Sequence, residues 1–147
     1  MTKFYIRRKF LAALIDYSII FTIFFLLVSI FGRPSEDNHE IIELKGFPAF
    51  ISMFLPWFIS IVCFETFLGA TLGNGIVGLK PVDQKNKSRN LTFIQSFQRH
   101  LLDPIDMFFF GLIGYLVMKN NNGQRLGDIW AKTVVVKYEA KKTSANS

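Results

Sequence analysis

The chain has 147 residues, the length of one domain; half of them are hydrophobic, 16% are aromatic and 17 are phenylalanine. Together with a positive mean hydropathy, this composition is too apolar for the core of a small soluble domain and predicts a membrane protein. The Lys and Arg residues that give the net charge of +6 lie beside long apolar stretches. This placement favours loops at an anionic membrane surface over a nucleic-acid-binding face. The single cysteine, Cys63, excludes a disulfide framework and a multi-thiolate metal site.

Residues 10–31 form the first apolar run, broken only by Asp16. At 1.5 Å per residue, its 22 residues span about 33 Å, enough to cross a bilayer core. The basic residues before it resemble a signal peptide's start, but the run is too long and no Ala-x-Ala cleavage pattern follows. We therefore predict a retained transmembrane helix.

A polar segment over 32–46 predicts a loop, with a short helical turn at 40–44. The second apolar run, 47–68, is again long enough to span and carries one charge, Glu65, near its end. Pro56 lies in mid-span, where it is expected to kink the helix and free a carbonyl group.

The glycine-rich stretch 69–75 lacks the Lys-Ser/Thr ending of a phosphate-binding loop, so Gly69 and Gly73 indicate a tight exit from the second helix. Residues 76–82 and 133–138 are strand-like, and 139–147 predict a disordered polar tail. Between the strands, 91–103 is amphipathic at helical spacing with Thr92 as its N-cap. The apolar run 104–118 is too short for an untilted span.

Lys and Arg concentrate before the first span, at 80–99 and after residue 118, whereas the loop between the spans is acidic. The positive-inside rule then places the N-terminus in the cytoplasm and the acidic loop outside. A third full span would export the basic C-terminal segment. We therefore favour a re-entrant helical hairpin over 91–118, broken at Asp103-Pro104, over a third complete span. The two strands then pair as a small cytoplasmic β-ribbon.

Asp16 and Glu65 both lie in the cytoplasmic third of antiparallel helices, and an acid at that depth usually faces protein or water. Together they form a candidate cation or proton site. The alternative is that each pairs with a base, Arg8 or Arg99, and only holds the bundle together.

Arg99, Asp103 and Asp106 have i, i+4, i+7 spacing and are expected to share a polar helix face if Pro104 does not break the helix. An amphipathic interfacial helix with an internal ion pair is the alternative. No His or Cys cluster has ligand spacing, and no nucleophile–base set is visible, so we expect no metal, no cofactor and no enzymatic activity.

Three short blocks resemble the RDD family of small bacterial membrane proteins, which is named for one Arg and two Asp residues. They are Arg8 to Asp16, then Gly69 to Gly73 followed by Gly78 to Asp83, and finally Gln124 to Asp128 followed by 133–136. On this resemblance the family motif is Arg8, Asp16 and Asp128. The alternative for Asp128 is a cap or a local pair with Arg125. Asn74 stands where the family usually has Lys.

The resemblance implies a single multipass membrane domain over 1–138, with helices at about 10–31, 47–68 and 91–118, in the bacterial cytoplasmic (inner) membrane. The family's activity is unsettled, with transport a recurring suggestion. Our first hypothesis is a small-solute or cation/proton transport component that uses Asp16 and Glu65. The alternative is a non-transporting scaffold or accessory subunit. Expected partners are the bilayer, with anionic lipids at its cytoplasmic face, and further copies or subunits of a larger membrane complex.

Overall fold

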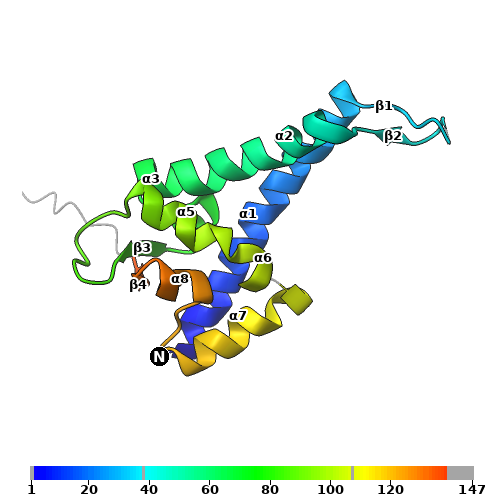
Figure 1. Cartoon of the computed structure of the whole chain (residues 1–147). Helices are drawn as coiled ribbons and strands as arrows, with labels where there is room; N and C mark the ends of the chain where they lie inside the picture. The colour runs from blue at the N-terminus through cyan, green and yellow to red at the C-terminus, as the bar shows by residue number, and fades with distance from the viewer. Residues whose placement is uncertain (1, 38, 107, 139–147) are drawn as a thin grey trace, which may run out of the picture.

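The computed structural model describes residues 2–37, 39–106 and 108–138 of the chain. The first helix, α1 (Thr2–Phe31), begins earlier than the predicted residue 10, so the basic residues that precede the apolar run are themselves helical. It is the longest element and runs through most of the length of the molecule (Figure 1). The predicted polar tail, 139–147, lies outside the described residues.

A short β-hairpin follows α1, formed by β1 (Arg33–Pro34) and β2 (Ile42–Glu43). The expected helical turn at 40–44 was therefore wrong. The backbone N–H of Ser35 donates to the carbonyl of Ile41 at 2.8 Å, which extends the pairing beyond the strands. Two adjacent β-branched isoleucines favour this extended pairing over a helical turn.

The second apolar helix is continuous from Gly46 to Leu68 but changes its winding. It consists of α2 (Gly46–Trp57), a π-helical segment η1 (Phe58–Cys63) and α3 (Phe64–Leu68). The π-helical segment begins two residues after Pro56. Pro56 lacks an N–H, so the regular hydrogen-bond ladder is already interrupted where the helix widens.

The next segment begins with a short helix, α4 (Leu72–Ile76), and the strand β3 (Leu79–Asp83) follows. The predicted strand start at residue 76 was therefore too early. Thr71 caps α4, and Gly78, with φ +68°, turns the chain into the strand. As predicted, β3 pairs with the C-terminal strand β4 (Thr133–Lys137), in antiparallel register from Leu79–Lys137 to Asp83–Thr133.

The third apolar region forms three helices, α5 (Phe93–Leu101), α6 (Asp103–Asp106) and α7 (Phe108–Asn120). Thr92 is the N-cap of α5, as predicted, and forms a capping box with Gln95. The large bend, 115°, separates Phe93–Asp106 from Gly111–Asn120, which is later than the expected break at Asp103-Pro104. A last short helix, α8 (Leu126–Trp130), leads into β4.

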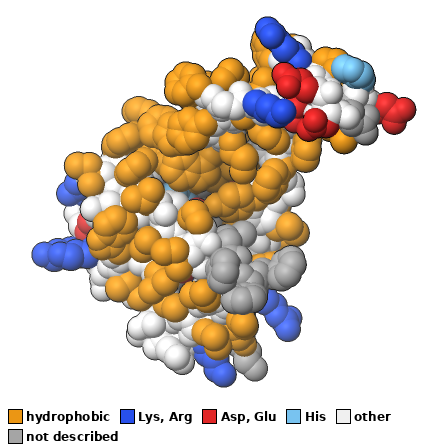
Figure 2. All heavy atoms as spheres, turned by 45° about the vertical axis from the view of Figure 1, so that its right-hand side comes forward, with side chains coloured by type: hydrophobic (Ala, Val, Ile, Leu, Met, Phe, Trp, Pro, Cys, Tyr) orange, Lys and Arg blue, Asp and Glu red, His pale blue; other side chains and the backbone are white. Residues whose placement is uncertain are grey.

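The fold is mostly helical, with two helices long and apolar enough to cross a membrane and a third if the bent pair counts as one span. Hydrophobic side chains cover much of the surface in Figure 2, and the Asp and Glu side chains seen there gather mainly at the β1–β2 end, whereas Lys and Arg side chains lie at both ends. Apart from Ser35, the buried polar side chains of the described residues lie toward the opposite end, where α1 meets α4, α5 and α8. That region holds the candidate site.

Candidate functional site

The carboxylate of Asp16 attaches α1 to the start of α4. Its Oδ2 accepts a hydrogen bond from Thr71 Oγ1, and its Oδ1 accepts one from the backbone N–H of Gly73, both at 2.7 Å. Thr71 Oγ1 in turn accepts the backbone N–H of Asn74. A Cβ at Gly73 would overlap the carbonyl oxygen of Ala12, so the close approach of the two helices requires glycine there. Asp16 therefore has a packing role that depends on the glycine-rich loop.

Asp128, at the third position of α8, is fully buried and lies among cations. Lys9 Nζ donates to its Oδ2 at 2.8 Å and to the carbonyl of Gly123 at 2.6 Å. Arg99 Nε lies 3.2 Å from its Oδ1, and the backbone N–H of Arg125 donates to Oδ2 at 3.0 Å. Burial raises the pKa of Asp128, but Arg99, Lys9 and Arg125 outweigh it and hold the pKa well below its usual range.

His100 lies between two buried carboxylates. Its Nε2 is 3.1 Å from Glu65 Oε2, and its Nδ1 is 2.7 Å from Asp103 Oδ2. Ser96 Oγ donates to Glu65 Oε1 at 3.1 Å, and Tyr17 donates to Asp103 Oδ2 at 3.2 Å. A neutral imidazole has one N–H, so the ring donates to both ionised carboxylates only when it is protonated.

Two arginines join these acids to Asp128. Arg99, 1% exposed, places its Nε 3.7 Å from Glu65 Oε1 as well as beside Asp128. Arg125 places Nη1 3.2 Å from Asp103 Oδ1. Because each arginine has more donors than these contacts use, the network has spare buried donors, including Arg99 Nη1 and Arg125 Nε.

Asp106 stabilises the start of α8 in the way Asp16 stabilises α4. Its two oxygens accept the backbone N–H groups of Leu126 at 3.3 Å and Gly127 at 3.4 Å. A Cβ at Gly127 would overlap the carbonyl oxygen of Arg99, so α8 approaches α5 through a glycine. Both Asp-to-glycine junctions are therefore points of close backbone packing.

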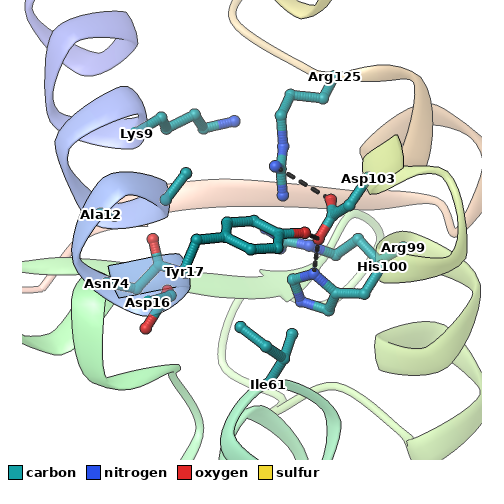
Figure 3. A pocket seen from close by; sticks show the side chains of 11 residues that line it. Lys9, Ala12, Asp16, Tyr17, Ile61, Asn74, Arg99, His100, Asp103 and Arg125 are labelled. Atoms are coloured by element: carbon teal, nitrogen blue, oxygen red, sulfur yellow. Dashed lines mark hydrogen bonds and ion pairs between the residues drawn. The ribbon is translucent and has the colours of Figure 1, made fainter. Parts of the chain in front are cut away.

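A small cavity of about 20 Å³ lies among these groups, with room for a single water molecule. Figure 3 shows Tyr17 reaching from α1 toward Asp103 and His100. The polar side chains that line the cavity are Lys9, Asp16, Tyr17, Asn74, Arg99, His100, Asp103 and Arg125.

We call the titratable groups of this region the buried charge network: the acids Asp16, Glu65, Asp103, Asp106 and Asp128, and the bases Lys9, Arg99, His100 and Arg125. Five carboxylates thus face four bases, one of them a histidine. Even with His100 protonated, the acids exceed the bases by one. Because an uncompensated buried charge is costly, this excess favours a proton held on one of the carboxylates.

The model of the RDD family matches residues 4–132, a range that includes every member of the network. The chain belongs to the RDD family. No curated protein and no solved structure matches it.

The predicted motif residues Arg8, Asp16 and Asp128 each bind a different part of the chain. Arg8 donates to the carbonyl of Val77 at 3.2 Å, which ties α1 to the end of α4. The α1 residue that reaches Asp128 is instead its neighbour Lys9. The two motif acids therefore attach α1 to different parts of the later chain, Asp16 to α4 and Asp128 to α8.

Asp16 and Glu65, the predicted paired acids, face the same network but have different hydrogen-bond partners. Glu65 lies beside Arg99, which agrees with the pairing alternative for that acid. Arg99, Asp103 and Asp106 are all buried and all join the network despite the helix break between Leu101 and Asp103. Asn74 lines the cavity, and Gly69 ends α3 in the left-handed conformation that a tight exit requires.

Sequence reasoning did not select Lys9, Tyr17, Thr71, Ser96 or His100 as site residues. For Lys9 a signal was available, since its seven-residue separation from Asp16 puts both on one helix face. His100 precedes Asp103 by three residues, the spacing of an i, i+3 pair. The contacts of Thr71 and Ser96 depend on chain segments 55 and 31 residues away, for which the sequence carries no local signal.

Proposed function

We propose that this RDD-family protein is a non-transporting structural component of a membrane assembly. In this role the buried charge network holds the N-terminal half of α1 against α4, α5 and α8. The observation that carries the proposal is that the polar cavity has room for only one water molecule, while both oxygens of Asp16 already bind within the protein. A hydrated ion or a small solute does not fit there.

The charges around Asp16 also argue against the binding of a cation in the cavity. A cation at the cavity would face Lys9, Arg99 and Arg125, which line it together with Asp16 (Figure 3). Repulsion from three cationic side chains in a low-dielectric site is expected to outweigh attraction to the two lining carboxylates, Asp16 and Asp103, because the oxygens of both already have partners within the protein. Asp16 and Glu65 as ligands of a single metal cation are therefore disfavoured.

The strand pairing bears on topology. β3 lies before the bent helices and β4 after them, yet the two strands are hydrogen-bonded along their length. They therefore belong on one side of a membrane, so the chain between them crosses an even number of times or re-enters. This supports a re-entrant α5–α7 over a third full span. The Lys9–Asp128 pair supports placing the N-terminus on that same side.

We further propose that this side is the cytoplasm of a bacterial cell, because it carries the basic segments. Cysteine substitution at Ser144 tests the topology. Labelling by a membrane-impermeant maleimide only after lysis is expected, and labelling from outside intact cells would contradict it.

Reconstitution into proteoliposomes tests the structural role. Wild-type vesicles are expected to pass sodium, potassium and protons no faster than protein-free vesicles. Asp16→Asn should lower the melting temperature, because an amide replaces a charged acceptor of two hydrogen bonds. Asp37→Asn, an exposed acid of the loop after α1, is the matched control and should leave stability unchanged. Flux in the wild type that Asp16→Asn abolishes without loss of folding would refute the proposal.

Native mass spectrometry of protein extracted in lipid nanodiscs tests the assembly. A dimer, a higher oligomer or a stoichiometric complex is expected. A protein that stays monomeric at its native membrane density would count against an assembly role.

Proton translocation is the second candidate, and the excess of one acid over the four bases is the observation that favours it. His100, between Glu65 and Asp103, is the group best placed to pass a proton. A pH-sensitive dye inside the vesicles measures this directly. Proton entry that is driven by an imposed potential and lost in His100→Gln would establish translocation, whereas equal rates with and without protein would exclude it.

A further inference from the structure

A second feature lies outside the network, where an open groove of about 540 Å³ separates the N-terminal part of α1 from α7. Its walls are largely apolar, formed by Ile6 and Phe10 of α1 and by Leu112, Tyr115 and Met118 of α7. Phe10 and Leu112 are each 52% exposed, so apolar surface is open at this point. The one charged residue of the lining is Arg7, and no acid contributes to it.

Arg7 differs from the two basic residues that follow it. Lys9 turns into the protein and binds Asp128, and Arg8 donates to the carbonyl of Val77. Arg7 is exposed and, among the described residues, has neither a hydrogen-bond nor an ion-pair partner. The three residues are consecutive on a helix, so each points about 100° from the next, and only Arg7 is directed to the groove.

We propose that the groove binds one acyl chain of an anionic phospholipid, whose phosphate is held by Arg7. Arg7 lies three residues before the apolar run that begins at Phe10, hence about 4.5 Å outside it along the helix, at the depth of lipid phosphates. The guanidinium group supplies two parallel donors to a phosphate, and the apolar walls below it accept a hydrocarbon chain. A net negative headgroup matches a lining whose only charge is positive.

The same charge argues against a second copy of the chain as the occupant. Packing the groove against a symmetric copy would bring two Arg7 side chains together without an acid in either lining, and buried like charges repel. An isolated inorganic anion would leave the apolar walls uncovered. A phospholipid satisfies the charge and the walls together.

Native mass spectrometry with added lipids tests the site on the full-length protein. Phosphatidylglycerol and phosphatidylcholine of identical acyl chains are compared, with inorganic phosphate as a competitor. The wild type is expected to retain phosphatidylglycerol more tightly, and Arg7→Gln to weaken that binding about fivefold to tenfold. Arg7→Lys should restore most of it. Arg33→Gln, an exposed arginine just beyond the other end of α1, is the matched control and should bind as the wild type does.

Leu112→Trp tests the apolar part, because the larger side chain fills the groove while Arg7 is retained. It is expected to release the lipid without changing the melting temperature, which shows that the variant is folded. Equal retention of the two lipids, or unchanged binding by Arg7→Gln, would overturn the proposal. Full displacement of phosphatidylglycerol by inorganic phosphate would also overturn it, since the site would then recognise only the free anion.

Discussion

The two halves of α1 differ both in charge and in surroundings, because all the charged residues of the helix lie at or before Asp16. The part of α1 up to Ile20 buries Lys9, Ala12, Asp16 and Ile20, which recur every three or four residues on one face. Beyond Ile20, by contrast, large side chains such as Phe25, 63% exposed, point outward. In a bilayer, apolar surface needs no burial against protein, whereas charge does. The polar residues of such a helix therefore mark its protein-facing side more reliably than its hydrophobic ones.

Two ion pairs at opposite ends of the molecule show the same contrast between exposed and buried charges. Lys45 Nζ lies 2.6 Å from Glu43 Oε1, with 67% and 30% of the two side chains exposed. Lys9 Nζ lies 2.8 Å from Asp128 Oδ2, with 8% and 0% exposed. The distances are similar, but water screens the first pair and not the second. Removing one partner is consequently expected to lower the stability of the protein only for the second pair.

Replacement of Asp128 is the strongest test of this difference. Asp128→Ala leaves Lys9 and Arg99 buried without their shared carboxylate and should cost about 3–5 kcal/mol of unfolding free energy. Glu43→Gln, the matched change in the exposed pair, should leave the melting temperature within experimental error. Circular dichroism during thermal unfolding in detergent measures both. Similar losses of stability in the two variants would show that burial does not determine how much each ion pair contributes to stability.

A smaller effect is expected from the glycines of the loop that Asp16 holds. In Gly73→Ala the new methyl group meets the Ala12 carbonyl, a backbone atom that cannot rotate away, and the expected cost is about 1–3 kcal/mol. Gly75, in the same short helix, has open space around its Cβ position, so Gly75→Ala should be neutral or slightly stabilising. If both variants unfold at one temperature, the close α1–α4 contact is not rigid.

The smallest effect is the pH dependence that Asp128 contributes. Its pKa is lower in the folded protein than in the unfolded chain. Its contribution to stability is thus complete above the unfolded value, about 3.9, and is lost as the pH falls below it. The difference in unfolding free energy between wild type and Asp128→Asn should be constant above about pH 5 and shrink by about 1 kcal/mol at pH 3. A difference that grows on acidification would contradict the sign of this shift.

Much of the fold was predictable. Both long apolar helices, the Thr92 cap and the pairing of the two strand-like segments follow from local hydropathy, side-chain shape and loop charge. Three features were not predictable: the β1–β2 hairpin, the early start of α1 and the position of the sharp bend. Each depends on pairing or packing that a short window of sequence does not contain. The site was predictable as a set of acids, though not as a set of contacts.

By itself the sequence determined where the two helices long and apolar enough to cross a membrane lie, and that Asp16, Glu65 and Asp128 need partners. Only the tertiary structure decided which partners they have. Lys9 meets Asp128 across 119 residues, and Asp16 meets Gly73 across 57. The physical reason is that periodicity along one helix records which face is polar, whereas the identity of the opposing group depends on how close two backbones come. Here glycines at residues 73 and 127 set that distance.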